Sequence, residues 1–131
     1  MERILRTVLI VTAALAAACA PRERTLVLLS TNDMHAKIRN FPRLAAAVEA
    51  CRDTAQLVVL VDAGDRWTGN AYVDRAATPG MPMIALMNRL GYDVATLGNH
   101  EFDHGQAFLG RMIDSMDFEV VCANVVSDTC S

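Results

Sequence analysis

Four short apolar runs alternate with three amphipathic segments along this chain. The runs have the length of single strands and occupy residues 25–30, 57–61, 94–97 and 118–123. Between them, apolar residues recur every three or four positions, the period of a helix, over residues 41–51, 83–90 and 109–116. This alternation predicts the α/β class: a βαβαβαβ chain with a mostly parallel sheet whose strands are buried on both faces.

Helix boundaries and one long loop follow from single polar, Gly and Pro positions. Asn40 is placed to cap the first helix, which tolerates Pro42 in its first turn. Gly91 is placed to end the second helix. Residues 66–82 are rich in Gly, Thr, Asn and Pro and form one long loop. Loops of this length in a compact domain are usually functional.

The N-terminus has the pattern of a secretory leader. Two arginines precede an apolar run, residues 8–18, which is short for a membrane span and ends in small residues. The run stops at Cys19 and polar residues follow at once, as in a bacterial lipoprotein. We therefore expect a signal peptide over residues 1–18, a lipid anchor to the membrane at Cys19 and a tether over residues 19–24. The protein would then be exported to the bacterial periplasm or cell envelope. An ordinary leader with an incidental cysteine is the alternative.

The net charge narrows the classes of binding partner. The formal net charge is −3, so we expect no nucleic-acid partner, which would require a clustered basic face.

Besides Cys19, the chain has Cys51 on the apolar stripe of a helix, Cys122 in a predicted strand, and Cys130. Three thiols cannot all pair within one chain, and their pairing stays open. We expect Cys51 and Cys122 to be buried thiols.

Polar clusters follow three of the apolar runs. Asp33 and His35 follow the first run, Asp65 the second, and Asn99 and His100 the third. In open parallel sheets, ligands bind at the carboxyl ends of the strands, and all three clusters fall there. Mixed oxygen and imidazole ligands suit Zn, Mn, Co, Fe or Mg. Together the clusters predict a shared site for two divalent metal ions of open identity.

The residues of these clusters resemble a known family. The segments that carry the resemblance are Thr31-Asn32-Asp33-Met34-His35, Val61-Asp62-Ala63-Gly64-Asp65, Leu97-Gly98-Asn99-His100-Glu101-Phe102-Asp103 and Ala123-Asn124-Val125. They are similar to the calcineurin-like metallophosphoesterase superfamily, and most of all to its exported 5′-nucleotidase branch. The resemblance implies a two-metal hydrolase of phosphoesters. It also implies an α/β/β/α sandwich, of which residues 25–131 would form the N-terminal half.

The resemblance assigns a role to each metal-ligand candidate. Asp33 and His35 would bind the first ion. Asp65 would bridge both ions, and Asn99 would bind the second through its amide oxygen. The substrate would be a small phosphoester, most of all a nucleotide 5′-phosphate.

The resemblance also implies a catalytic pair. His100 would lie close to the phosphate as electrostatic stabiliser or general acid, and Asp103 would orient it. Two neighbouring acids have simpler interpretations: Asp62 fixes its loop by hydrogen bonds, and Glu101 braces its turn. Trp67 either packs over the site or covers the loop, and the sequence does not separate these two.

Three functional hypotheses remain open. The first is a 5′-nucleotidase-like hydrolase, the second a truncated, lipid-anchored remnant without catalysis, and the third a phosphoesterase acting on cyclic nucleotides or nucleotide sugars. The family's remaining ligands, a later histidine and a Gly-His-x-His segment, have no counterpart among the three histidines of this chain, His35, His100 and His104. We therefore expect weak binding of the second ion, little activity from this chain alone, and an exposed apolar sheet face or edge. Oligomeric state stays open.

Overall fold

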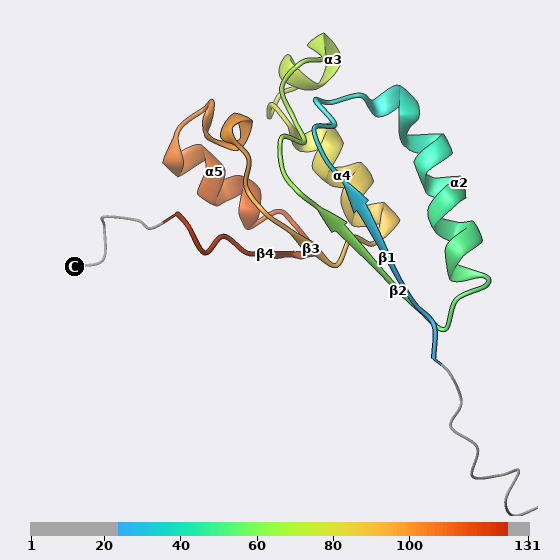
Figure 1. Cartoon of the computed structure of the whole chain (residues 1–131). Helices are drawn as coiled ribbons and strands as arrows, with labels where there is room; N and C mark the ends of the chain where they lie inside the picture. Colours follow the sequence, from blue (N-terminus) through green and yellow to red (C-terminus); the bar gives the residue numbers. More distant parts are fainter. Residues whose placement is uncertain (1–23, 126–131) are drawn as a thin grey trace, which may run out of the picture.

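A computed structural model describes residues 24–125 of the chain (Figure 1). The predicted leader, the lipidation site at Cys19, most of the tether and Cys130 lie outside the described residues. None of the helices between residues 24 and 125 has the length and apolar composition of a membrane span.

The described chain alternates strands and helices, as the sequence predicts. The strands are β1 (Leu26–Thr31), β2 (Leu57–Asp62), β3 (Val94–Ala95) and β4 (Glu119–Val120). The helices that connect them are α2 (Phe41–Arg52), α4 (Met81–Leu90) and α5 (Gln106–Ile113). Three shorter helical turns are η1 (Ile38–Asn40), α3 (Ala71–Asp74) and η2 (Asn99–Phe102).

All four strands form one parallel sheet in the order β1-β2-β3-β4. The pairing of β1 with β2 runs the full length of both strands, from Leu26 opposite Leu57 onward. β3 and β4 are shorter than predicted, with two paired residues each. The α/β class is confirmed, and the carboxyl ends of the strands share one edge, as the site prediction requires.

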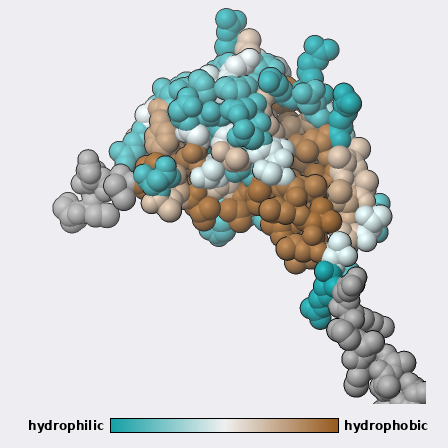
Figure 2. Space-filling model, viewed as in Figure 1, coloured by the Kyte–Doolittle hydropathy of each residue, from teal (hydrophilic) through white to brown (hydrophobic). Residues whose placement is uncertain are grey.

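Within residues 24–125, helices cover only one face of the sheet. Right-handed crossovers that always step in the same direction bring every connecting helix to the same side. The opposite face exposes Leu26, Leu28 and Leu57, at 60%, 64% and 57% of their surface. Figure 2 shows a broad hydrophobic patch over β1 and β2. The prediction of strands buried on both faces is therefore wrong for this chain, whereas the expected exposed apolar face is present.

Of the two helix ends predicted from single residues, one forms as expected. Gly91 ends α4 with φ of 72°, a left-handed conformation that glycine adopts without strain. Asn40 precedes α2 as predicted but makes no side-chain cap, which corrects the prediction. The reason is local: the 3-10 turn η1 already brings the backbone of Asn40 into helical conformation, whereas a cap residue is normally extended.

Three further predictions need adjustment. The long loop contains the short helix α3, whose N-terminus is capped when Asn70 accepts from the Tyr72 N–H at 2.9 Å. The third helix, α5, both starts and ends earlier than predicted. Cys51 and Cys122 are half-buried free thiols rather than buried ones. Cys51 lies in the last turn of α2, and Cys122 lies beyond the end of β4, so neither reaches the core.

Candidate metal centre

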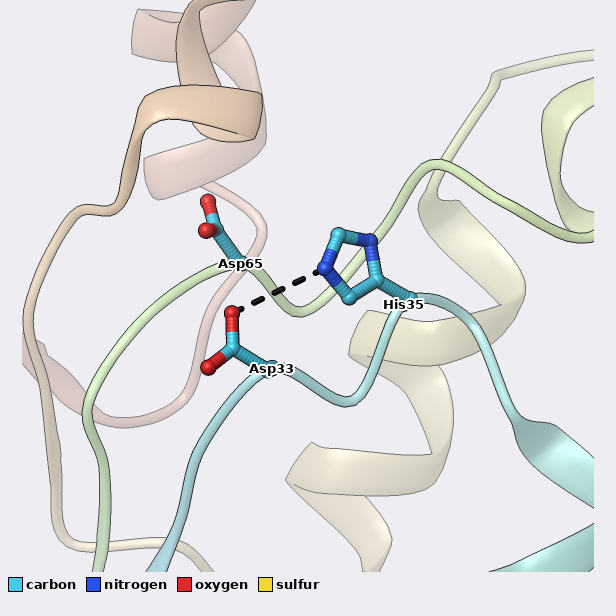
Figure 3. A group of neighbouring side chains, drawn as sticks. All are labelled: Asp33, His35 and Asp65. Atoms are coloured by element: carbon cyan, nitrogen blue, oxygen red, sulfur yellow. Dashed lines mark ion pairs between the residues drawn. The ribbon is translucent and has the colours of Figure 1, made fainter.

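Three predicted metal ligands meet at the carboxyl ends of β1 and β2 (Figure 3). Asp33 and His35 lie on the loop after β1, and Asp65 lies on the loop after β2. One potential ligand atom from each residue lies within 4.8 Å of the other two. His35 Nε2 is 3.6 Å from Asp33 Oδ1. Adjacent parallel strands thus bring together side chains that are distant in the sequence.

The backbone of these ligands is held in an uncommon conformation. Asp33, His35 and Asp65 have φ of 49°, 44° and 54°. Residues other than glycine rarely adopt this left-handed region, which costs energy and is concentrated at functional sites. Backbone hydrogen bonds between the two loops maintain it: Asp33 N–H donates to Gly64 O at 3.1 Å, and His35 N–H donates to Asp65 O at 3.0 Å.

A backbone carbonyl fixes the tautomer of His35. Its Nδ1 lies 3.1 Å from Thr68 O. A carbonyl oxygen only accepts, so Nδ1 carries the proton of the neutral ring and Nε2 keeps its lone pair. Nε2 is the atom that faces Asp33. Metal-binding histidines are oriented in this way when the second ring nitrogen donates to a carbonyl or carboxylate.

Asn99 lies beside Asp65, at the start of η2. One terminal atom of its amide is 3.2 Å from Asp65 Oδ2, and the other is 3.3 Å from the backbone nitrogen of His100. With its nitrogen toward Asp65, the amide donates to the carboxylate. With its oxygen toward Asp65, two acceptors face each other, an arrangement that a shared cation stabilises. In either orientation the Asn99 amide lies beside the Asp65 carboxylate, and its role as a metal ligand stays a prediction.

His100 and Asp103 form a pair next to these ligands. His100 Nδ1 lies 2.8 Å from Asp103 Oδ2, and both side chains are 34% exposed. The hydrogen bond with Asp103 raises the pKa of His100 above its ordinary value. The same bond lowers the pKa of Asp103, and a hydrogen bond from Thr68 adds to this effect. The ring of His100 meets that of His35 edge to face, with centroids 5.0 Å apart.

Buried charges underlie the site, and their interpretation as loop braces is confirmed. Asp62 Oδ2 accepts from Arg66 Nε at 2.9 Å, and both side chains are fully buried. Glu101 is also fully buried and accepts backbone N–H groups. The role of Arg66 was not predicted, because one arginine directly after a Gly-Asp turn does not differ in sequence from a surface residue.

Trp67 covers the loop rather than the site. Its side chain is 1% exposed and packs in a cluster with Ile84, Leu109 and Met112. Its indole Nε1 donates to His100 O at 3.0 Å. This bond ties the long loop to η2, the turn that carries His100.

Comparison with known proteins decides the family. The family model of calcineurin-like phosphoesterases matches residues 26–126. The chain belongs to this family. It therefore belongs to a family of metal-dependent phosphoesterases, and the sequence resemblance is confirmed.

The relatives of this calcineurin-like phosphoesterase chain are much longer proteins. It is 34% identical to the trifunctional nucleotide phosphoesterase protein YfkN of Bacillus subtilis, covering 76% of this chain and 8% of the relative. It is 31% identical to a 5′-nucleotidase of Bos taurus, and the match covers 81% of this chain and 21% of that protein. The structure of a 5′-nucleotidase precursor from Thermus thermophilus aligns with a TM-score of 0.69 and 31% identity. The alignment covers 76% of this chain and 22% of that one. The chain thus spans about a fifth of these relatives or less.

The donor set suits the metal ions that this family uses. Two carboxylates, an imidazole and an amide are ligands that Zn, Mn, Co, Fe and Mg accept. Metal bonds to nitrogen and oxygen are about 2.0–2.2 Å long, so two donors of one ion lie up to about 4.4 Å apart. The 4.8 Å span of the donors on Asp33, His35 and Asp65 is close to this limit. Small side-chain adjustments therefore suffice for these three residues to hold one ion.

Proposed function

We propose that this chain supplies part of a two-metal site that hydrolyses small phosphoesters, with nucleotide 5′-phosphates as the first candidates. The observation that carries the proposal is the convergence of Asp33, His35 and Asp65 ligand atoms within 4.8 Å at one sheet edge. The names of the relatives, nucleotide phosphoesterase and 5′-nucleotidase, support the substrate class. Cyclic nucleotides and nucleotide sugars are the alternative substrates, and a non-catalytic binding remnant is the alternative function.

The proposed ligands divide between two positions. Asp33 and His35 Nε2 hold the first cation, the Asp65 carboxylate is shared, and the Asn99 amide oxygen holds the second. Paired divalent cations neutralise phosphoryl oxygens and lower the pKa of bound water. The strained, hydrogen-bonded loops present these donors in a fixed arrangement, which reduces the reorganisation needed on binding.

His100 is the proposed proton donor to the leaving oxygen. Asp103 accepts from its Nδ1 and raises its pKa, so a larger fraction of the imidazole is protonated near neutral pH. Nε2 is then the atom that can give its proton or stabilise negative charge. The N–H group of His100 itself donates to Asp65 Oδ1 at 2.9 Å, which links the catalytic candidate to the shared carboxylate.

We also propose an exported, lipid-anchored location. The supporting pattern is the apolar run that ends in small residues at Cys19. Expression in a bacterial host should give a membrane-bound protein whose mature N-terminal peptide begins at Cys19 and carries lipid in mass spectra. A Cys19→Ser variant should lose that mass. Cleavage elsewhere without lipid would show an ordinary leader instead.

The functional test is metal-dependent phosphate recognition by the full chain. Calorimetry should show that the Mn²⁺-loaded protein binds AMP and inorganic phosphate, whereas adenosine, which lacks the phosphate, does not bind. Removing Mn²⁺ should abolish both signals. Cyclic AMP and a nucleotide sugar test the alternative substrates in the same assay. Equal phosphate binding with and without metal would overturn the proposal.

A further inference from the structure

The buried carboxylate of Glu101 accepts backbone N–H groups from both sides of the site. Oε2 accepts from Asp65 at 2.8 Å and from Gly98 at 2.6 Å, and Oε1 accepts from Arg66 at 3.0 Å. Asp65 and Arg66 follow β2, whereas Gly98 precedes η2. One side chain therefore joins the two loops that carry the shared carboxylate and the second-metal ligand.

The connection is reciprocal at Asp65. Its backbone N–H donates to Glu101, and its side-chain Oδ1 accepts from the backbone N–H of His100 at 2.9 Å. Neighbouring residues of η2 thus hold both the main chain and the side chain of Asp65. The φ of 54° at Asp65 is unfavourable for a residue with a side chain, so it requires such support.

Arg66 offsets the energetic cost of burying the Glu101 carboxylate. Its guanidinium is fully buried, with Nε 2.9 Å from Asp62 Oδ2 and 4.0 Å from Glu101 Oε1. It also donates to Thr96 O, beyond the end of β3. Buried carboxylates are costly unless a buried cation and hydrogen bonds offset their desolvation. Both conditions are met here, so Glu101 can remain an acceptor of several N–H groups in the interior.

We propose that Glu101 is a positioning residue that sets the conformation of Asp65 and Gly98, and thereby the metal affinity of the site. The inference rests on the proposed metal-binding function. Glu101 touches neither substrate nor cation in this role. Its effect passes through the Asp65 backbone, in the way that residues behind metal ligands control affinity.

Glu101→Gln is the informative substitution because it keeps the shape and removes an acceptor. Each carboxylate oxygen accepts at least one backbone N–H. Whichever way the amide is turned, its NH₂ group faces an N–H donor. Glu49→Gln is the matched control, since Glu49 lies on the surface of α2 in an ion pair with Arg52.

The experiment compares the full chain with both variants by Co²⁺ titration and by amide NMR without metal. We expect Glu101→Gln to weaken Co²⁺ binding about 10- to 100-fold and to shift the amide resonances of Asp65, Gly98 and His100. Glu49→Gln should change neither. The fluorescence of Trp67, the one tryptophan, reports whether the variants are folded. A folded Glu101→Gln variant with the original Co²⁺ affinity and unshifted amides would overturn the proposal.

Hydrogen exchange in the unsubstituted chain decides the case if Glu101→Gln does not fold. The amides of Asp65 and Gly98 should exchange slowly although both lie outside strands and helices. Exchange as fast as in exposed loops would overturn the positioning role. Failure of the unsubstituted chain to bind Co²⁺ would instead refute the proposed metal function, while the amide shifts and exchange rates still decide the role of Glu101.

Discussion

The rings of His35 and His100 lie edge to face with centroids 5.0 Å apart, although they follow strands that are not neighbours in the sheet. β2 separates β1 from β3, so the loops must fold over its end to bring the rings together. His35 is fixed by Thr68 O, and His100 by Asp103. A metal-ligand candidate and a proton-donor candidate therefore share one small volume.

The His100–Asp103 pair predicts a defined pH dependence. Their hydrogen bond raises the pKa of His100 and lowers the pKa of Asp103. The raised His100 pKa means that its contribution to stability is present below the unfolded pKa and lost as pH rises through the folded pKa. The lowered Asp103 pKa means that its contribution is present above the unfolded pKa and lost as pH falls through the folded one. The pair therefore stabilises the fold most between about pH 4 and 6.5.

Asp103→Asn tests this dependence directly. The NMR titration of the His100 ring, without metal, should give a lower pKa in the variant than in the original chain. Asp117→Asn, an exposed position after α5, is the control and should leave the titration unchanged. An unchanged His100 pKa in Asp103→Asn would show that Asp103 does not raise the pKa of His100.

Gly98→Ala should damage the site through backbone crowding. A Cβ at this position would lie 2.7 Å from the backbone nitrogen of Asp65, too close for either loop to stay in place. We expect a loss of about 1–3 kcal/mol in the free energy of unfolding, together with weaker Co²⁺ binding. Gly110→Ala in α5 is the control, because its Cβ would meet no atom within 4 Å. That change should stabilise by about 0.5–1 kcal/mol. Similar urea midpoints for both variants would contradict the prediction.

Arg66→Met should be strongly destabilising. It leaves the buried carboxylates of Asp62 and Glu101 without their cation. Removing one partner of a buried ion pair typically costs about 3–5 kcal/mol. Urea denaturation should show this loss, whereas the exposed Arg43→Met on α2 should change the free energy of unfolding by less than about 0.5 kcal/mol. A small effect of Arg66→Met would mean that the interior adapts to unpaired acids.

The apolar sheet face should bind hydrophobic probes. Leu26 and Leu28 project from the uncovered face of β1 and are mostly exposed. A Leu26→Lys/Leu28→Lys double variant should reduce ANS fluorescence and self-association in sedimentation, because contiguous apolar surface favours both. Its urea midpoint should change little. Tyr72→Lys on α3, also exposed, is the control. Unchanged ANS binding in the double variant would show that this sheet face does not bind the hydrophobic probe.

The sequence predicted the elements that depend on local pattern. Apolar runs and helical periodicity located β1, β2, α2 and α4, and the strand-end rule placed Asp33, His35 and Asp65 at one edge. Local patterns could not show which sheet face is covered. That depends on the direction of successive crossovers, which is a property of the whole topology.

The tertiary contacts of the residues that support the site could not be predicted from the sequence. Arg66 and Glu101 are charged, and charged residues are usually exposed, so burial could not be predicted from type alone. Their burial results from mutual pairing across two loops. The same holds for Thr68, whose role in orienting His35 depends on its backbone carbonyl rather than its side chain. Tertiary contacts of this kind leave no periodic signal in the sequence.

Calorimetric titration of the full chain with Mn²⁺, beside its Asp65→Asn variant, tests the central claim most directly. We expect the unsubstituted chain to bind one ion more tightly than the second, because three ligands converge on the first position and two on the other. Asp65→Asn should weaken both events, the first by about 100-fold or more, since loss of a group behind a ligand alone costs about 10- to 100-fold. The exposed Asp114→Asn control at the end of α5 should weaken neither. Unaltered Mn²⁺ binding by Asp65→Asn would contradict the account.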